Sequence, residues 1–151
     1  MAKKDKIIGD LSKDFDTEGK LEFCKLDLLN DAGWHAAMEG CDYVLHVASP
    51  FINKEPKDEN LYIKPAVEGT QRALKAAKKA GIKRMVLTSS MVSMLGDADE
   101  SIEMNQSSWT NVHSKNVSAY AKSKTLAEKS AWKFIKEQDK PSPLELVVVN
   151  P

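Results

Sequence analysis

Three short apolar runs alternate with two long amphipathic patterns, and this alternation limits the folds open to the chain more than any other feature. The apolar runs cover residues 43–48, 84–89 and 144–149. Each is too short for a typical helix and rich in aliphatic residues, so each predicts a buried strand, with 43–48 covered on both faces. Helical patterns lie between them at 64–80 and 120–136. Strands that alternate with helices predict an α/β fold with a parallel sheet and helices on both faces.

The first helical pattern carries a stop signal and a charged pair. Gly81 follows it directly, and a glycine in the left-handed conformation commonly ends a helix. Glu68 and Arg72 stand four residues apart, which predicts an ion pair on the helix surface. The positions that share the apolar face are Val67, Thr70, Leu74 and Ala77.

The first forty residues give weaker signals. Residues 1–20 are polar and have no clear period, which predicts a weak helix or a loop. Residues 21–28 predict another strand, with Asp27 at its carboxyl end. A short helix capped by Asn30 or Asp31 is expected to end at Gly40.

The charge balance and the cysteines exclude several classes of protein. Lys and Arg number 22, as do Asp and Glu, and the two signs are intermixed, which argues against a nucleic-acid or anionic-membrane partner. No apolar run approaches the about 20 residues that span a bilayer, and the start lacks a signal-peptide core. A cytoplasmic location is therefore expected, with Cys24 and Cys41 as buried free thiols and no metal site.

Residues capable of proton chemistry stand at the start of the second helical pattern and at the end of a strand. Tyr120 and Lys124 are four residues apart, so both side chains leave the same helix face. An ammonium about 5 Å from a phenol stabilises its tyrosinate by roughly 3 kcal/mol at an effective dielectric near 20. Alone, such a pair is more often a solvated helix face. Ser90, however, follows the strand at 84–89, and open α/β sheets place their chemistry at the carboxyl ends of strands.

In this order, Ser90, Tyr120 and Lys124 resemble the Ser-Tyr-Lys set of the extended short-chain dehydrogenase/reductases, which belong to the NAD-dependent epimerase/dehydratase family. The dihydroflavonol-4-reductase-like branch is the most similar. The resemblance runs from about residue 21 to residue 151 and implies a partial, Rossmann-like, doubly wound dinucleotide-binding domain over 1–151, with no second domain. The other segments that carry it are residues 26–28, 40–50, 67–70 and 86–90.

The resemblance also implies a role for each of these residues. Tyr120 would protonate the substrate carbonyl oxygen as hydride arrives, Lys124 would assist it and hold the nicotinamide ribose, and Ser90 would hydrogen-bond the carbonyl. Ser89 and Ser93 are rivals for the role of Ser90. The implied cofactor contacts are Asp27 and Leu28 at the adenine, Val47, Ala48 and Ser49 beneath the cofactor, Thr88 at the ribose and Pro151 at the nicotinamide.

Parts that the resemblance implies are absent from this sequence. No two of the seven glycines lie within three residues of each other, so no glycine-rich turn can cradle a pyrophosphate. In the usual doubly wound order, two further strands would lie between residues 21–28 and 43–48, and their absence exposes an apolar strand edge. The chain is therefore interpreted as a fragment, inactive alone, that also lacks most of the substrate-binding part.

The function implied is NAD(P)H-dependent reduction of a small aldehyde or ketone, with NADP as the expected cofactor and NAD as the alternative. A nucleotide-sugar epimerase or dehydratase uses the same three residues, but residues 47–50 favour a reductase. A non-catalytic module is the alternative from another class, and a homodimer would form through the helix at 120–136. The long loop at 96–115 predicts either a lid or a solvated excursion pinned by Trp109.

Overall fold

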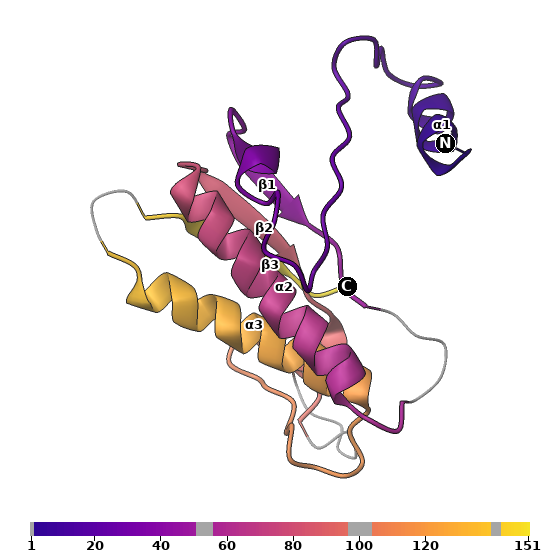
Figure 1. The fold of residues 1–151 in the computed structure, drawn as a ribbon. Helices are drawn as coiled ribbons and strands as arrows, with labels where there is room; N and C mark the ends of the chain where they lie inside the picture. Colours follow the sequence, from indigo (N-terminus) through magenta and orange to yellow (C-terminus); the bar gives the residue numbers. More distant parts are fainter. Residues whose placement is uncertain (1, 51–55, 97–103, 140–142) are drawn as a thin grey trace.

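The computed structural model contains a three-stranded parallel sheet with two long helices packed against it (Figure 1). The strands, in their order across the sheet, are β1 (Tyr43–His46), β2 (Arg84–Thr88) and β3 (Glu145–Val149). The predicted α/β class and parallel pairing are therefore confirmed. The structure describes residues 2–50, 56–96, 104–139 and 143–151.

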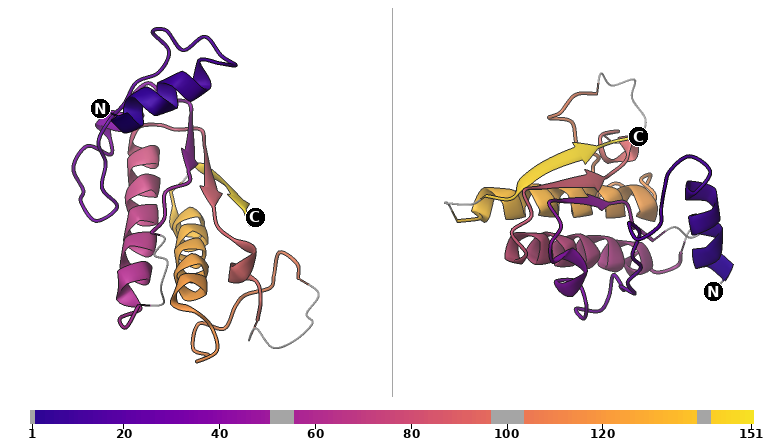
Figure 2. Two further views of the ribbon diagram at one scale, coloured as in Figure 1. Left: turned by 90° about the vertical axis from the view of Figure 1, so that its right-hand side faces the viewer. Right: turned by 90° about the horizontal axis from the view of Figure 1, so that it is seen from above.

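The two long helices are α2 (Asn60–Lys79) and α3 (Ala119–Glu137), and they lie side by side on one face of the sheet (Figures 1 and 2). Helices on both faces were expected, and this is wrong for the described residues. The reason is topological: both connections step in the same direction across the sheet, and right-handed crossovers in one direction place their helices on the same face. The short helices are α1 (Ala2–Leu11), η1 (Ala36–Met38) and η2 (Met91–Ser93).

Helix α2 follows its sequence pattern closely, although it begins four residues before the predicted start. Thr70, Leu74 and Ala77 are buried against the sheet, as expected, while Val67 is half-buried. Gly81 ends the helical region with a φ of 73°, a left-handed conformation that glycine adopts at little cost. The predicted pair also forms, with Arg72 Nη1 3.0 Å from Glu68 Oε2.

Helix α3 is fixed at both ends by side-chain hydrogen bonds. The Ser118 hydroxyl caps the first turn by accepting the Ala121 N–H at 3.1 Å, which starts the helix just before Tyr120. At the other end, Gln138 donates to the Leu144 carbonyl and accepts the Leu144 N–H, both at 2.9 Å. These contacts set where α3 begins and ends relative to β3.

The core lies between the sheet and the two helices, and it leaves the other sheet face uncovered in the described residues. Met85 and Leu87 of β2 point inward and are buried. On the outer face, Leu45 of β1 is 73% exposed and Val147 of β3 is 42% exposed. The prediction that residues 43–48 are covered on both faces is therefore wrong, because both neighbouring helices lie on the inner face. The apolar edge expected at this strand is present.

The predicted strand at residues 21–28 does not form; the segment is coil, and Phe23 is 41% exposed. An isolated strand has no neighbour to satisfy its backbone groups, so it gains nothing from the extended pairing geometry. Cys24, in this segment, and Cys41, just before β1, were expected to be buried free thiols; both are free, but both are exposed. The helix predicted from residue 30 shrinks to η1, which is followed by Gly40 with a φ of 75°.

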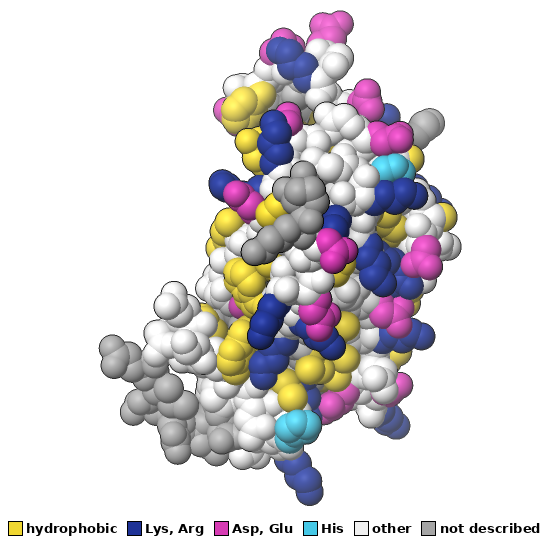
Figure 3. Space-filling model, turned by 90° about the vertical axis from the view of Figure 1, so that its left-hand side faces the viewer, with side chains coloured by type: hydrophobic (Ala, Val, Ile, Leu, Met, Phe, Trp, Pro, Cys, Tyr) yellow, Lys and Arg dark blue, Asp and Glu magenta, His cyan; other side chains and the backbone are white. Residues whose placement is uncertain are grey.

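The surface carries both charge signs in close mixture. On the face drawn in Figure 3, basic and acidic side chains are interspersed, with hydrophobic side chains between them. None of the helices in the described residues has the length and apolarity that a bilayer crossing requires.

Candidate active site

The carboxyl end of β2 meets the first turns of α3 through one buried lysine. Lys124 Nζ donates to the Thr88 carbonyl at 3.0 Å, and the residue is 6% exposed. The same nitrogen lies 5.9 Å from the centre of the Tyr120 ring. Burial lowers the pKa of Lys124, because the charged amine loses part of its hydration. The structure thus brings Thr88, Tyr120 and Lys124 together. A lysine on a solvated helix face, the alternative interpretation, would be exposed, whereas Lys124 is buried.

Tyr120 is half-buried and its ring is held from the side of α2. The buried ring of Tyr62 packs edge-on against it, with 6.1 Å between ring centres and 73° between ring planes. Aromatic pairs favour such an edge-to-face arrangement. Two neighbouring helices therefore fix the direction in which the Tyr120 phenol points.

Ser90 lies two residues beyond Lys124's partner Thr88 and contacts the end of the chain. Its hydroxyl donates to the Pro151 carbonyl at 3.3 Å, and Met91 N–H donates to the same oxygen at 2.9 Å. Ser90 and Pro151, both predicted site residues, are therefore neighbours. The convergence of the Ser90 hydroxyl with the Tyr120 phenol stays a prediction.

The two rival serines are engaged elsewhere. Ser89 is 4% exposed and Ser93 is fully buried. The Ser89 hydroxyl points to that of Ser93 at 3.5 Å, and Ser93 donates to Glu128 Oε2 at 2.9 Å. Both hydroxyls face the interior between η2 and α3, which favours half-buried Ser90 as the serine that a substrate would meet.

Glu128 is the centre of a buried network that the sequence reasoning missed. The residue is 6% exposed, and its Oε2 accepts Asn150 Nδ2 at 2.9 Å in addition to the Ser93 hydroxyl. Asn150 Nδ2 also lies 3.0 Å from Ser93 Oγ and 3.2 Å from the Ser90 carbonyl. Trp132 Nε1 donates to the other carboxylate oxygen at 3.4 Å. The network joins α3, β3 and η2 directly behind Ser90.

A sequence signal for Glu128 did exist. It stands four residues after Lys124 and eight after Tyr120, so all three share one face of α3. A charged residue at that position reads as solvated unless a partner is known, and its partner Asn150 is 22 residues away.

Several predicted cofactor contacts line one small cavity between the strand ends and α3. Its walls include Ala48, Ser49, Thr88 and Lys124. Val47, the residue directly after β1, does not line this cavity and is 65% exposed. A second, apolar hollow of about 310 Å³ lies between residues 26–28 and β1, where two further strands were expected, and Val47 and Ala48 are among the residues that line it.

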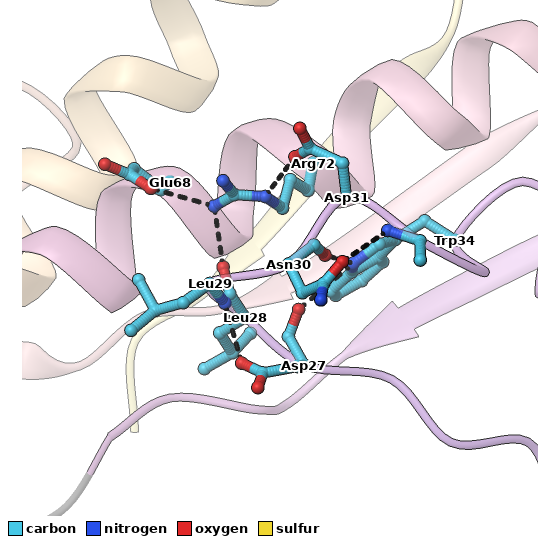
Figure 4. Close-up of polar contacts among 9 residues, drawn as sticks. Asp27, Leu28, Leu29, Asn30, Asp31, Trp34, Glu68 and Arg72 are labelled. Carbon is cyan, nitrogen blue, oxygen red and sulfur yellow. Dashed lines mark hydrogen bonds and ion pairs between the residues drawn. The ribbon is translucent and has the colours of Figure 1, made fainter.

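The other two predicted cofactor residues lie on a turn over α2 (Figure 4). Asp27 Oδ1 accepts the Leu29 N–H at 2.8 Å, which closes the turn. Trp34 Nε1 donates to the carbonyls of Asp27 at 3.2 Å and Asn30 at 2.9 Å. Asp27 is exposed and Leu28 half-buried, so the turn presents a carboxylate and an aliphatic side chain.

His46 of β1 is a core histidine. It is 6% exposed and its ring centre lies 6.3 Å from that of Trp34. Burial, and then the charge of Lys124, lower the pKa of His46 to about 4. Within the described residues, no group of three or more His, Cys, Asp and Glu side chains is placed to hold a metal ion.

The residues present fit part of a nicotinamide dinucleotide. Lys124 uses one of its three N–H donors on the Thr88 carbonyl, so a second donor can serve a ribose hydroxyl. The exposed Asp27–Leu28 turn suits a base and its polar edge. The sequence has no glycine-rich turn for the pyrophosphate.

Comparison with known proteins gives a consistent family. The sequence model described as "NAD dependent epimerase/dehydratase family" matches residues 5–151. The chain is 39% identical over 137 residues to tetraketide alpha-pyrone reductase 1 of Arabidopsis thaliana, covering 87% of this chain and 41% of that protein. It is 36% identical over 143 residues to an anthocyanidin reductase of Vitis vinifera, covering 88% and 40%.

A solved structure of similar fold is the yeast methylglyoxal/isovaleraldehyde reductase Gre2 complexed with NADPH. It matches with a TM-score of 0.70 and 33% identity, over 83% of this chain and 41% of that one. The Rossmann-like fold class is thereby confirmed. The chain spans about two fifths of the length of the curated relatives it matches.

Proposed function

The chain belongs to the NAD-dependent epimerase/dehydratase family, and we propose that it carries the proton-transfer residues and part of the cofactor site of an NADPH-dependent reductase of small aldehydes or ketones. The observation that carries the proposal is the position of Lys124, bonded to the Thr88 carbonyl at 3.0 Å and 5.9 Å from the Tyr120 ring. It puts a buried cation and a phenol at the carboxyl end of a parallel sheet, where such folds bind nucleotides.

Tyr120 acts as the general acid in the proposed reaction. NADPH, when bound, supplies the hydride that adds to the carbonyl carbon. The Tyr120 hydroxyl gives its proton to the carbonyl oxygen, so the product is an alcohol and the phenol becomes a tyrosinate. Lys124 stabilises that anion through its charge and holds a ribose hydroxyl with a remaining N–H.

Ser90 orients the substrate carbonyl in this proposal. Its contact to Pro151 is 3.3 Å long, at the weak end of hydroxyl hydrogen bonds, so the hydroxyl can turn to a substrate oxygen at little cost. A donor aimed at the oxygen where negative charge develops lowers the barrier. Ser93 is held by its 2.9 Å bond to Glu128, and Ser89 is only 4% exposed, so neither hydroxyl is as open to a substrate as that of Ser90.

The cofactor proposed is NADP, with NAD as the alternative. Asp27 and Leu28 would contact the adenine, residues 47–49 would pass beneath the cofactor, and Thr88 and Pro151 would flank the nicotinamide end. The yeast reductase of similar fold is complexed with NADPH, which favours the phosphorylated cofactor.

Two wider expectations stay proposals. A homodimer through α3 is supported by Trp132, an aromatic residue of that helix that is 40% exposed. Sedimentation at several concentrations tests it. The cytoplasmic location rests on the sequence alone.

The test of the catalytic role is the substitution Tyr120→Phe. It is made in a longer form of the protein, one that includes a glycine-rich turn and oxidises NADPH with methylglyoxal as the probe substrate. Loss of the proton donor is expected to reduce kcat by about 10³-fold or more, because general acid catalysis contributes about 10²–10⁴-fold. NADPH affinity should change by less than about 2-fold, since the ring remains.

Lys124→Ala is the matched variant, and it should weaken both turnover and NADPH binding. Turnover by Tyr120→Phe at the unsubstituted rate would remove Tyr120 from the mechanism. The 151-residue chain by itself is expected to turn over nothing, since it has no glycine-rich turn, and NADPH oxidation by it would contradict that expectation.

A further inference from the structure

We infer that Gly69 and Arg72, one turn apart on α2, are positioning residues that seat the Asp27–Leu28 turn for a nucleotide. The inference rests on the proposed function, because it requires this turn to contact the adenine end of the cofactor. It concerns how the turn is held, which the fold class leaves open.

The turn is not held by strand pairing. Residues 21–28 are coil, and Asp27 and Leu29 are exposed. The bonds from Asp27 to Leu29 and from Trp34 to the turn carbonyls shape the segment internally, and Trp34 also packs into the core from the far side. Contacts from α2 must therefore fix the side that carries Leu28.

Arg72 supplies the polar part of that contact (Figure 4). Its Nη1 donates to the Leu28 carbonyl at 2.7 Å, and its Nε donates to the Asp31 carboxylate. Glu68 accepts from the same guanidinium at 3.0 Å and holds it from the helix side. The Arg72 side chain is only 19% exposed, so the fork is fixed in one direction. One side chain thus joins α2 to Leu28 in the turn and to Asp31 just after it, both more than 40 residues away.

Gly69 supplies the steric part. A Cβ at this position would lie 2.5 Å from Leu28 Cδ2 and 3.0 Å from Leu28 Cβ, so a larger residue would require the Leu28 side chain, including its Cβ, to shift from its seat on the helix. Glycine inside a helix costs about 1 kcal/mol relative to alanine, and a glycine kept at this cost needs a packing reason. Close contact with Leu28 is that reason.

The two contacts act on the same residue from adjacent positions. Gly69 lets the Leu28 side chain lie on the helix, and Arg72 fixes the Leu28 carbonyl above it. Together they fix the position of the Asp27 carboxylate relative to α2. One carboxylate oxygen closes the turn, and the other can accept a hydrogen bond from the amino group of a base.

Trp34 is a natural reporter of this seating. Its indole N–H bonds to the turn carbonyls, so its hydrogen-exchange rate in NMR spectra measures whether the turn stays in place. The signal is assigned with Trp109→Phe and Trp132→Phe, which remove the other two indoles. Arg72→Ala and Gly69→Ala should each accelerate its exchange by about 10-fold or more, whereas Arg84→Ala, which breaks a surface pair with Glu145, should not.

The functional readout is the Kd for NADPH, measured by titration of the same longer, NADPH-oxidising form of the protein. Arg72→Ala and Gly69→Ala should raise its Kd by about 10-fold, and Arg72→Lys should restore little, because an ammonium cannot bond a carbonyl and a carboxylate with the same fork geometry. Asp31→Asn is the variant for which folding is not at issue, since Asp31 is 87% exposed, and it should raise the Kd by about 2–3-fold.

Each outcome decides something. Unchanged indole exchange in Arg72→Ala and Gly69→Ala would overturn the inference, as would faster exchange with an unchanged NADPH Kd. Failure of the unsubstituted protein to bind NADPH would count against the proposed function, while the exchange rates would still decide whether Gly69 and Arg72 hold the turn.

Discussion

The two ends of the proposed cofactor site are built in opposite ways. At the α3 end, Lys124 and Glu128 are both 6% exposed and bond to groups at the ends of β2 and β3. At the other end, the Asp27–Leu28 turn is coil and is held by one arginine and one close glycine contact. The first end is part of the core, whereas the second is attached to it. Changes in the core should therefore affect folding, and changes around the turn should affect ligand binding with little effect on folding.

The largest expected effect sets the core against the coil. Leu74→Ala removes a fully buried side chain from the layer between α2 and the sheet, and should lower the free energy of unfolding by about 3 kcal/mol. Phe23→Ala, in the coil segment, should change it by less than about 1 kcal/mol, because Phe23 is 41% exposed. Urea unfolding followed by circular dichroism measures both. Equal losses would mean that the segment at 21–28 belongs to the cooperative core.

Glu128→Ala should have the next largest effect. It leaves the half-buried amide of Asn150 and the buried hydroxyl of Ser93 without their acceptor, which is expected to reduce the free energy of unfolding by about 2–3 kcal/mol. Glu128→Gln keeps an acceptor of the same shape and should lose less than half as much. The same urea titration checks this pair, and similar losses for both would show that the charge, not the hydrogen bonding, holds the network.

The pH dependence of stability probes His46, a buried histidine close enough to Lys124 to feel its charge. Its folded pKa is about 4 against about 6.5 unfolded, so between these values the unfolded chain binds the proton and the folded chain does not. Stability should therefore fall as the pH drops below 6.5, by about 2 kcal/mol between pH 7 and pH 5 from this residue alone.

The comparison variants for this effect are His46→Gln and His113→Gln. The first should flatten the fall between pH 7 and pH 5 by about 2 kcal/mol, and the second should not, because His113 is exposed. A fall of the same size in His46→Gln would assign the pH effect to other groups.

The smallest of these effects concerns the start of α3. Ser118→Ala removes the hydroxyl that accepts the Ala121 N–H and should cost about 1 kcal/mol in unfolding free energy. Ser118→Asp, which keeps an acceptor and suits a helix N-terminus, should restore it. Because the cap sets the turn that carries Tyr120, the Ala variant should also accelerate amide exchange there, and protection as in the unsubstituted chain would argue against this.

Elements with their own hydrogen-bonding period were the predictable part of the fold. Strands β2 and β3, helices α2 and α3, the Gly81 stop and the Glu68–Arg72 pair all followed from local pattern. The segment at 21–28 did not, because a strand depends on a neighbour that a local pattern cannot supply. Glu128 and Gly69 were missed for a related reason: each is explained by a contact with Asn150 or Leu28 that only the folded chain brings near.

The uncovered outer face of the sheet should make this protein prone to self-association in solution. Leu45, 73% exposed, and Val47, 65% exposed, stand beside the free edge of β1, which the described residues leave unpaired. Exposed aliphatic strand edges act as templates for further strands, so concentrated solutions should scatter light and bind hydrophobic dyes. A charge at this edge, as in Leu45→Lys, should keep the material dispersed, and this variant is the natural background for spectroscopy at millimolar concentration.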